Sequence, residues 1–323
     1  MPSFQAMAGT LISSGKLRDV EAAIEASLHG KPEAVRMALV CLLARGHLLI
    51  EDVPGVGKTT LAQALARSVD GLFHRLQFTS DMLPSDVLGV TVYNSRSGEF
   101  EFKPGPIFTN FLLADEINRT TPKTQSALLE AMNEQQVSVE GRTLRLPEPF
   151  MVIATQNPVE HHGTYPLPES QLDRFLMRIR IGYPDAASER EIVRQFEAQH
   201  GDATPRVLSA ADLAELQDAV RQVAVDESLV TYILAIVERT RNHEALSLGV
   251  SPRGAQALFR AVQAWAVLEG RGYALPDDVK ALAVAVLAHR IAPASRSGLA
   301  RRNGAGVAEG VLLDILNQVD VPI

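Results

Sequence analysis

The sequence has almost no cysteine, a deficit of basic residues and no long apolar run. Its single cysteine, Cys41, cannot form an internal disulfide, so nothing indicates an oxidising compartment. The first residues carry neither an early basic charge nor an apolar core, which argues against a signal peptide. The longest apolar stretch, around residues 38–50, is interrupted by Arg45 and His47 and falls short of a membrane span. These absences predict a cytoplasmic protein with no membrane span.

Acidic residues outnumber basic ones, 38 against 31, for a formal net charge of −7 at pH 7. Such a chain has no overall attraction to nucleic acid or to anionic membranes. Glycine and proline, at 22 and 18 residues, are at ordinary levels, which excludes collagen-like and low-complexity classes. The length of 323 residues corresponds to about two domains.

Apolar segments of strand length alternate with helical patterns in the first half of the chain. Predicted strands cover residues 47–50, 73–79, 111–114 and 150–155, and predicted helices cover residues 33–44 and 58–68. Strands separated by helices imply right-handed crossovers and a mostly parallel α/β sheet covered on both faces. Residues 90–102 and 137–146 alternate with period two around polar turns, so we predict two inserted β-hairpins.

Strand patterns end near residue 183, and helical patterns follow. Predicted helices cover residues 186–199, 210–223, 227–241, 252–269 and 276–290. Ser209, Asp226 and Ser251 stand at good helix starts. We therefore predict an α/β domain over residues 1–183, with an N-terminal helical segment, and an all-helical domain over residues 184–323.

A glycine-rich loop with phosphate-binding character joins the first strand to the next helix. Glycines let backbone N–H groups approach phosphate oxygens, a lysine meets the β- and γ-phosphates, and a hydroxyl meets Mg²⁺. Asp52 stands where the pattern G-x-x-x-x-G-K-[ST] has its first glycine, and aspartate tolerates unusual backbone angles. The alternative is a tight turn that happens to contain Gly-Lys-Thr. The predicted nucleotide-binding residues are Asp52, Pro54, Gly55, Val56, Gly57, Lys58, Thr59 and Thr60, with Lys58 also catalytic and Thr59 also a metal ligand.

A second strand, residues 111–114, ends in the acids Asp115 and Glu116. The carboxyl ends of parallel strands meet at one edge of a sheet, where ligands bind. We predict that Asp115 holds Mg²⁺ and that Glu116 orients and polarises the attacking water. Asn157, which follows residues 150–155, can hold the same water. Two acids that merely solvate a strand end are the alternative, but their combination with the glycine-rich loop favours a Mg-ATP site.

At these residues the sequence resembles the MoxR family of AAA+ ATPases, over nearly the whole chain from about residue 30. The segments that carry the resemblance are Gly46–Thr60, Gln77–Gly89, Ala114–Asn133, Ala154–Phe175, Ser251–Arg253 and Leu287–Ile291. The resemblance implies a P-loop AAA+ αβα domain followed by an all-helical lid domain, with the hairpins as the helix-2 insert and the pre-sensor-1 hairpin. The stretch 30–32 departs from the family's usual Val-Gly-Gln, at a position of adenine contacts.

The resemblance also implies roles for two arginines. Arg174 matches the arginine finger that reaches a neighbouring subunit's γ-phosphate, and Arg253 matches sensor 2, acting in cis or in trans. The alternatives are a helix-end salt bridge between Arg174 and Asp173, and a solvated helix start for Arg253. Gln77 or Thr79 can switch Glu116 between states, as a hypothesis.

An arginine that acts on a neighbour implies a ring, and this clade resembles hexamers. The family is thought to remodel protein clients in a chaperone-like way, including cofactor insertion, often with a partner that carries a von Willebrand A domain. Three alternatives stay open: a nucleic-acid motor, a P-loop kinase and a metal-chelatase motor subunit. The predicted hairpin tips are nearly balanced in charge, with Arg96 against Glu99 and Arg142 against Glu140, which makes nucleic acid an unlikely partner.

Three remaining features are interpreted as structural. Cys41 lies on the apolar face of a predicted helix and is assigned to the core. His161 and His162 are adjacent in a loop, without further ligands at metal-binding spacing. A small basic cluster is interpreted as a solvated face, with an acidic partner or a neighbouring subunit as the alternatives; it consists of Arg290, Arg296, Arg301 and Arg302.

Overall fold

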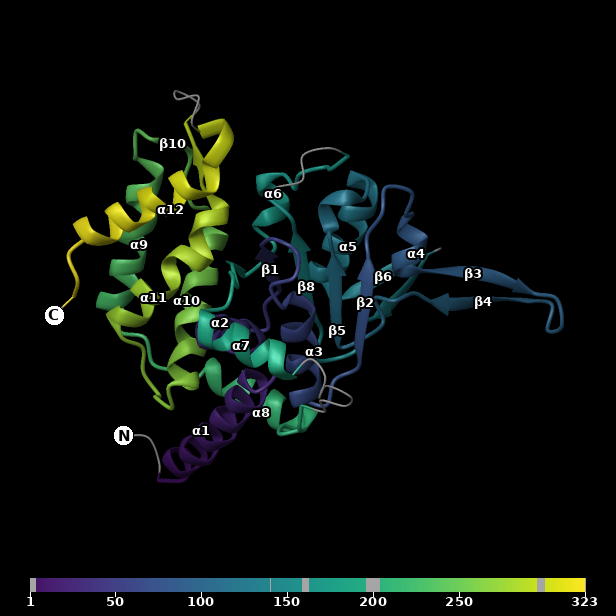
Figure 1. Cartoon of the computed structure of the whole chain (residues 1–323), viewed down its shortest axis with the longest axis horizontal. Helices are drawn as coiled ribbons and strands as arrows, with labels where there is room; N and C mark the ends of the chain where they lie inside the picture. The colour runs from purple at the N-terminus through teal and green to yellow at the C-terminus, as the bar shows by residue number, and fades with distance from the viewer. Residues whose placement is uncertain (1–3, 140, 159–162, 196–203, 295–299, 323) are drawn as a thin grey trace.

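A five-stranded parallel sheet lies at the centre of the N-terminal half (Figure 1). The computed structural model describes residues 4–139, 141–158, 163–195, 204–294 and 300–322. The strand order is β2-β5-β8-β1-β9 and every neighbouring pair is parallel, which confirms the predicted sheet. The fifth strand, β9, has three residues and left no sequence pattern. The strands are β1 (Leu48–Glu51), β2 (Phe73–Gln77), β5 (Phe111–Asp115), β8 (Met151–Gln156) and β9 (Met177–Ile179).

Alternate residues of the strands face two different cores, because successive side chains of a strand point to opposite faces. Ile50 and Leu113 belong to one core, and Leu49 and Leu112 to the other. The first core is covered by α1 (Phe4–Glu25), α2 (Pro32–Leu43) and α3 (Lys58–Ser68), and the second by α4 (Pro84–Leu88) and α5 (Pro122–Glu134). Cys41 is fully buried on α2, as predicted. Helices on both faces produce the αβα arrangement.

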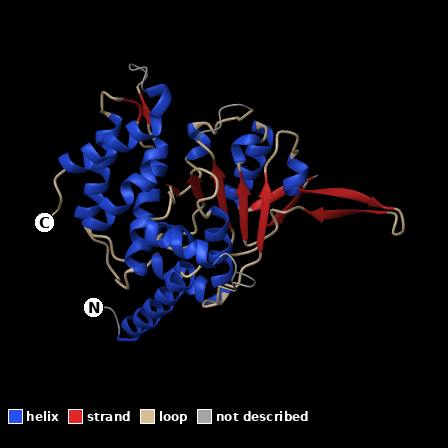
Figure 2. Cartoon of the chain, in the orientation of Figure 1, coloured by secondary structure: helices blue, strands red, loops and turns tan. Residues whose placement is uncertain are grey.

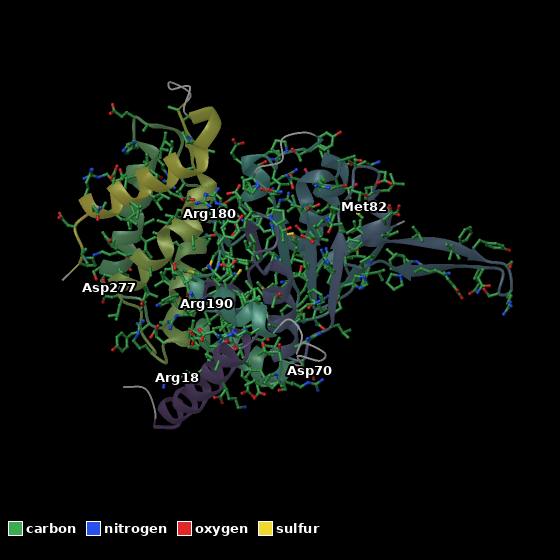
Figure 3. The ribbon with its side chains drawn as sticks, viewed as in Figure 1. Arg18, Asp70, Met82, Arg180, Arg190 and Asp277 are labelled. Atoms are coloured by element: carbon green, nitrogen blue, oxygen red, sulfur yellow. The ribbon has the colours of Figure 1, made fainter. Side chains whose placement is uncertain are left out.

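Both predicted hairpins are present as inserts in this domain. The first pairs β3 (Gly89–Asn94) with β4 (Glu99–Pro104), and the second pairs β6 (Gln136–Val139) with β7 (Arg142–Arg145). The β3–β4 hairpin projects from the body of the molecule (Figure 2). Its tip has two exposed aromatic rings, Tyr93 and Phe100, whose centroids are 5.4 Å apart. Side chains stand out on both sides of this hairpin (Figure 3).

The second half of the chain is mainly helical, as predicted, although its last helix was not predicted. Ser209, Asp226 and Ser251 accept backbone N–H groups of the helices they precede. The helices are α7 (Ala186–Gln195), α8 (Ala210–Val220), α9 (Glu227–Arg241), α10 (Pro252–Leu268), α11 (Pro276–Leu287) and α12 (Ala300–Gln318). Two short strands, β10 (Leu246–Leu248) and β11 (Ala292–Pro293), pair antiparallel and were not predicted, because so few residues leave no periodicity. Within the described residues, no helix is long and apolar enough to cross a membrane.

The later helices pack directly on the α/β domain. The first core continues without interruption from α2 into α10 and α11. Arg36 on α2 lies 4.7 Å from the centroid of the Trp265 ring on α10. At the end of β9, Arg178 and Arg180 both contact Glu309 of α12, each at 3.1 Å (Arg180 is labelled in Figure 3). Apolar packing and ion pairs therefore fix the position of the lid helices on the sheet.

Because of the buried His47, we expect the free energy of unfolding to fall in acid. Its Nδ1 accepts the Val152 N–H at 3.0 Å, so its Nε2 donates to the Met132 carbonyl at 3.1 Å. Burial lowers the pKa of His47 to about 4. Below an ordinary value of about 6.5 the unfolded histidine binds a proton that the folded one refuses, so acidification favours unfolding. We expect about 3 kcal/mol of unfolding free energy to be lost as the pH falls from 6.5 through 4.

Urea unfolding at a series of pH values measures this effect. His47→Gln should reduce the pH dependence between 6.5 and 4, leaving the contribution of His289, whose pKa is also lowered by burial. The same change at the exposed His74 should leave the pH dependence as in the wild type. An identical slope in His47→Gln and the wild type would show that His47 is not the responsible group.

Candidate functional site

The glycine-rich loop connects the carboxyl end of β1 to the first turn of α3. Gly55 and Gly57 have φ values of 86° and 97°, in the left-handed region that favours glycine. A Cβ on Gly57 would also come within 2.6 Å of the Leu28 side chain. The first N–H groups of α3 have no partner within the helix and point toward this loop, which is a favourable place for phosphate oxygens.

Lys58 lies at the start of α3, close to the acidic end of β5. Its ammonium group donates to the Asp52 carbonyl oxygen at 2.7 Å. Burial lowers the pKa of Lys58, and the nearby carboxylates of Asp115, Asp52 and Glu116 act in the opposite direction. The structure therefore brings the loop lysine and the two predicted acids, 57 and 58 residues apart, to one edge of the sheet.

Asp52 differs from what the sequence indicated. It is not among the residues with positive φ, so the reason offered for an aspartate at this position is wrong. Its buried carboxylate instead accepts backbone N–H groups of Val53, Ile181 and Gly182, at 2.8, 2.7 and 2.6 Å. Aspartate is therefore used as an acceptor that ties the loop to the segment after β9, a role that glycine cannot fill.

Asp115 is held by residues of both neighbouring strands. The Thr155 hydroxyl on β8 donates to its Oδ1 at 2.6 Å, and Arg75 Nη2 on β2 donates to its Oδ2 at 2.6 Å. The Thr155 Oγ1 also accepts the Glu116 N–H at 2.9 Å. Thr155 and Arg75 were missed by the sequence analysis. Arg75 lies two residues before Gln77 on β2, the strand next to β5. Because successive side chains of a strand alternate, those of Arg75 and Gln77 point to the same face of the sheet.

Glu116 adopts a left-handed conformation, with φ 57° and ψ 48°, immediately after β5. Gln77 Nε2 donates to its Oε2 at 2.6 Å, and Arg119 Nε lies 3.0 Å from the same oxygen. The sequence left Gln77 and Thr79 as alternatives for contacting Glu116. The contact is made by Gln77, whereas the Thr79 side chain bonds to Asp81, whose pKa it lowers.

Asn157 follows β8 and is buried, with 6% of its surface exposed. Because β8 lies between β5 and β1, Asn157 is at the same sheet edge, between the acidic pair and the glycine-rich loop. The sequence predicted that Asn157 can hold the attacking water, and this position permits that role.

A cavity of about 330 Å³ opens beside the glycine-rich loop. That volume is within the range of small-molecule sites. Lys31, in the stretch that departs from the family pattern, contributes to the wall, and its Nζ donates to the Tyr183 carbonyl at 2.6 Å. Other lining residues are Leu28, His29, Gly55, Val56, Gly57, Thr60, Pro184 and Ile192.

Arg174 and Arg253 lie at the amino ends of the parallel strands, opposite the carboxyl ends that carry the glycine-rich loop. Arg174 precedes β9, and the N–H of Leu176, two residues later, donates to the carbonyl of His47, just before β1. The four-residue β1, roughly 13 Å at 3.3 Å per residue, separates this edge from the loop. Arg253 shares a cavity of about 270 Å³ with Arg174 and donates to Asn133 Oδ1 at 2.7 Å.

Comparison with known proteins identifies the family. A family model described as ATPase family associated with various cellular activities (AAA) matches residues 47–177, and an AAA lid domain model matches residues 238–306. The chain is 44% identical to "Chaperone MoxR1" of Mycobacterium tuberculosis over 271 residues, 81% of this chain and 72% of that protein. The chain belongs to the MoxR family of AAA+ ATPases.

Two further relatives of this MoxR-family chain cover almost its whole length. "Uncharacterized protein YeaC" of Bacillus subtilis is 50% identical over 298 residues, 91% of each chain. A crystal structure described as an ATPase candidate from Cytophaga hutchinsonii is 38% identical, with a TM-score of 0.90 over 99% of this chain and 98% of that one. The predicted AAA+ domain and helical lid are thereby confirmed, and the MoxR-family chain is an ATP hydrolase.

The MoxR-family site has donors that suit a magnesium nucleotide. Among the described residues, no group of three or more His, Cys, Asp or Glu side chains gathers as a metal cage. Mg²⁺ bound to nucleotides does not need one, since it uses one or two side chains together with phosphates and waters. Thr59 in the first turn of α3 and Asp115 at the end of β5 are the side chains that fit this role.

Two other interpretations of the sequence concern the basic cluster that includes Arg290 and the adjacent histidines. Arg290 is wrongly assigned to a solvated face, because only 5% of its surface is exposed. Its charge made a surface position the better expectation, whereas an acidic partner and several carbonyls in fact surround it. His161, His162 and Arg296 lie outside the described residues, as do the side chains of Arg301 and Arg302.

Proposed function

We propose that this MoxR-family ATPase works as a ring, in this clade a hexamer, whose ATP sites are shared between neighbouring subunits. The observation that carries the proposal is the separation of Arg174 and Arg253 from their own P-loop by the sheet. Head-to-tail contacts that close produce rings, and they place one edge of a subunit against the opposite edge of the next. Such a contact brings both arginines of one subunit to the nucleotide of its neighbour, so Arg253 acts in trans.

The state of the Arg174 side chain supports this role. Asp173, its alternative partner, is paired with Arg290 at 2.7 Å. Among the residues that the structure describes, the Arg174 guanidinium makes no hydrogen bond or ion pair. The side chain is half-buried beside an open cavity and keeps its donors available for an incoming phosphate.

We infer a division of labour in which the chain binds Mg-ATP and activates water at the carboxyl edge of the sheet. Backbone N–H groups of residues 54–60, with Lys58, hold the phosphates, and Thr59 and Asp115 hold the metal. Bound Mg²⁺ supplies charge stabilisation for the transferring phosphoryl group. Glu116 takes the proton of the attacking water, and Asn157 orients that water.

We expect Gln77 to restrain ATP hydrolysis, because its amide donates a hydrogen bond to a carboxylate oxygen of Glu116 at 2.6 Å. Hydrogen bonds to charged groups contribute about 1.5–3 kcal/mol, so their loss changes the orientation of the carboxylate appreciably. We expect Gln77→Leu to raise basal ATP turnover several-fold by removing one of the two contacts that hold Glu116 Oε2, the other being that of Arg119. Steady-state phosphate release measures it, with Gln318→Leu at an exposed site as control. A fall in turnover would instead make Gln77 a residue that positions the base.

The work done by the ring is proposed to be the remodelling of a protein client, in a chaperone-like way that can include cofactor insertion. A von Willebrand A-domain protein is the proposed partner, and the cytoplasm, which supplies ATP, is the proposed location. The projecting β3–β4 hairpin carries Tyr93 and Phe100 together with Glu99 and Glu101. Exposed aromatic rings without an excess of basic charge suit a protein surface better than a phosphate backbone.

The test is ATP turnover per subunit over a wide range of protein concentration, with sedimentation of the same samples. Shared sites predict that turnover per subunit falls on dilution as rings dissociate. Constant turnover in samples that sediment as monomers would contradict the proposal. Phosphate transferred to water alone excludes the kinase alternative, and oligonucleotide binding that weakens with salt would favour a nucleic-acid motor.

A further inference from the structure

Arg290 is a buried charged residue that links the lid to the segment bearing Arg174. It belongs to a short 3-10 helix, residues 288–290, that follows α11. Its Nε donates to Asp173 Oδ1 at 2.7 Å. Its Nη2 donates to the carbonyl oxygens of Phe175 and Asp173, at 2.7 and 3.3 Å, and its Nη1 to that of Leu176 at 3.1 Å. Arg290 therefore binds the chain immediately before and immediately after Arg174.

The lid makes further contacts with the same few residues. His289 Nε2 lies 3.1 Å from the Phe175 carbonyl oxygen, which accepts. Ser251 Oγ lies 3.4 Å from Asp173 Oδ2, and this serine caps α10, accepting the Gly254 N–H at 3.2 Å. Asp173 thus contacts two separate lid segments, of which one carries Arg253 two residues further on.

The first turn of α10 packs closely on Arg290. A Cβ on Gly254 would lie 2.9 Å from Arg290 Cδ and 2.6 Å from Val250 Cγ1, so the helix and the guanidinium stem have no room between them. Arg253 and Arg174 line one cavity together with Asp173 and Arg290. The half-buried Arg174 and the exposed Arg253 therefore lie on either side of one buried ion pair.

Packing alone does not explain why residue 290 carries a charge. Burial of a guanidinium is costly, and a buried ion pair is often no more stabilising than apolar residues of the same volume. Burial lowers the pKa of Arg290 and the Asp173 carboxylate counters it. What an apolar side chain cannot do is hold three carbonyl oxygens and a carboxylate in a fixed arrangement, which the five donors of a planar guanidinium can.

We propose that Arg290 and Asp173 are positioning residues that present Arg174 and Arg253 to the neighbouring subunit as one rigid unit, set by the lid. This inference rests on the proposed sharing of sites between subunits. It implies that a rotation of the lid moves the arginine finger with it. Arg290 acts through Arg174 and does not itself contact the nucleotide.

The test uses mixed rings. Arg290→Gln keeps its own P-loop, Asp115 and Glu116 but presents a misplaced finger, so we expect the pure variant to lose ATP turnover by about 10²-fold. Glu116→Gln subunits cannot hydrolyse but retain an intact finger. Mixing Arg290→Gln with excess Glu116→Gln should restore turnover to the Arg290→Gln sites, because the neighbouring finger now completes them.

Four further measurements make the result decisive. Arg290→Lys, which keeps the charge but lacks the fork, should show the same loss and the same rescue, and nucleotide affinity of both variants should stay near the wild-type value. The exposed Arg239→Gln serves as the matched control and should hydrolyse ATP normally. Arg174→Ala mixed with Glu116→Gln should be rescued to a similar level.

Each outcome has a distinct meaning. If Arg174→Ala is not rescued, sites are not shared, and the proposed function falls together with this inference. If Arg174→Ala is rescued but neither Arg290 variant is, Arg290 supports its own subunit's fold or site, and the inference alone is overturned. Wild-type turnover by pure Arg290→Gln overturns it as well. Rescue of Arg290→Gln and Arg290→Lys with unchanged nucleotide affinity establishes it.

Discussion

Replacing Arg174 by alanine is expected to lower ATP turnover by about 10³-fold or more, with nucleotide affinity changed far less. A guanidinium opposite the transferring phosphoryl group stabilises charge that develops in the transition state, and such fingers contribute about 10³–10⁵ in rate. Arg174 has the features this requires, since it is half-buried at a sheet edge and its acidic neighbour is engaged by Arg290. The measurement is steady-state phosphate release at saturating ATP.

Two comparisons sharpen the Arg174 result. Arg174→Lys keeps the charge but loses the bidentate fork, so its turnover should lie between those of the wild type and Arg174→Ala. Arg239→Ala, an exposed arginine on α9, controls for a general loss of positive charge. Turnover of Arg174→Ala within a few-fold of the wild type, at concentrations where rings are present, would exclude a finger role.

Replacing Glu116 by glutamine is expected to lower turnover by about 10²–10⁴-fold, the range attributed to general acid–base groups. Glutamine keeps the size of the side chain but cannot accept the proton of the attacking water. The backbone of residue 116 is held independently, through its N–H bond to Thr155 Oγ1, so its left-handed geometry should survive the change. Single-turnover hydrolysis with saturating protein separates this chemical defect from slow product release.

Binding measurements provide the control for Glu116→Gln. Equilibrium binding of a fluorescent ATP analogue should stay within a few-fold of the wild-type affinity, because Lys58 and the P-loop backbone are untouched. Glu134→Gln, an exposed carboxylate at the end of α5, should hydrolyse normally. A Glu116→Gln protein that turns over ATP at the wild-type rate would move the general base to another residue.

Much of the nucleotide site could be predicted because its parts are local in the chain. The loop from Asp52 to Thr60 is continuous, and Asp115 and Glu116 directly follow an apolar strand. Parallel topology then brings strand ends together, so the meeting of Lys58 with the two acids needed no knowledge of side-chain packing. The residues that hold those acids in place could not be predicted from the sequence. Arg75, Thr155 and Arg119 are identified only by the pairing of β2, β5 and β8 and by short contacts.

The sequence by itself determined the fold class and the chemistry of this protein: a parallel sheet with two inserted hairpins, helices after residue 183, and a P-loop with its acidic partners. Periodicity and spacing are sufficient there, because each signal comes from residues close together in the chain. Only the tertiary structure decided that Arg253 lies with Arg174 across the sheet from the P-loop, and that Arg290 is buried against Asp173, 117 residues away. Long-range packing sets both, since no local pattern distinguishes an arginine in solvent from one enclosed by carbonyl oxygens.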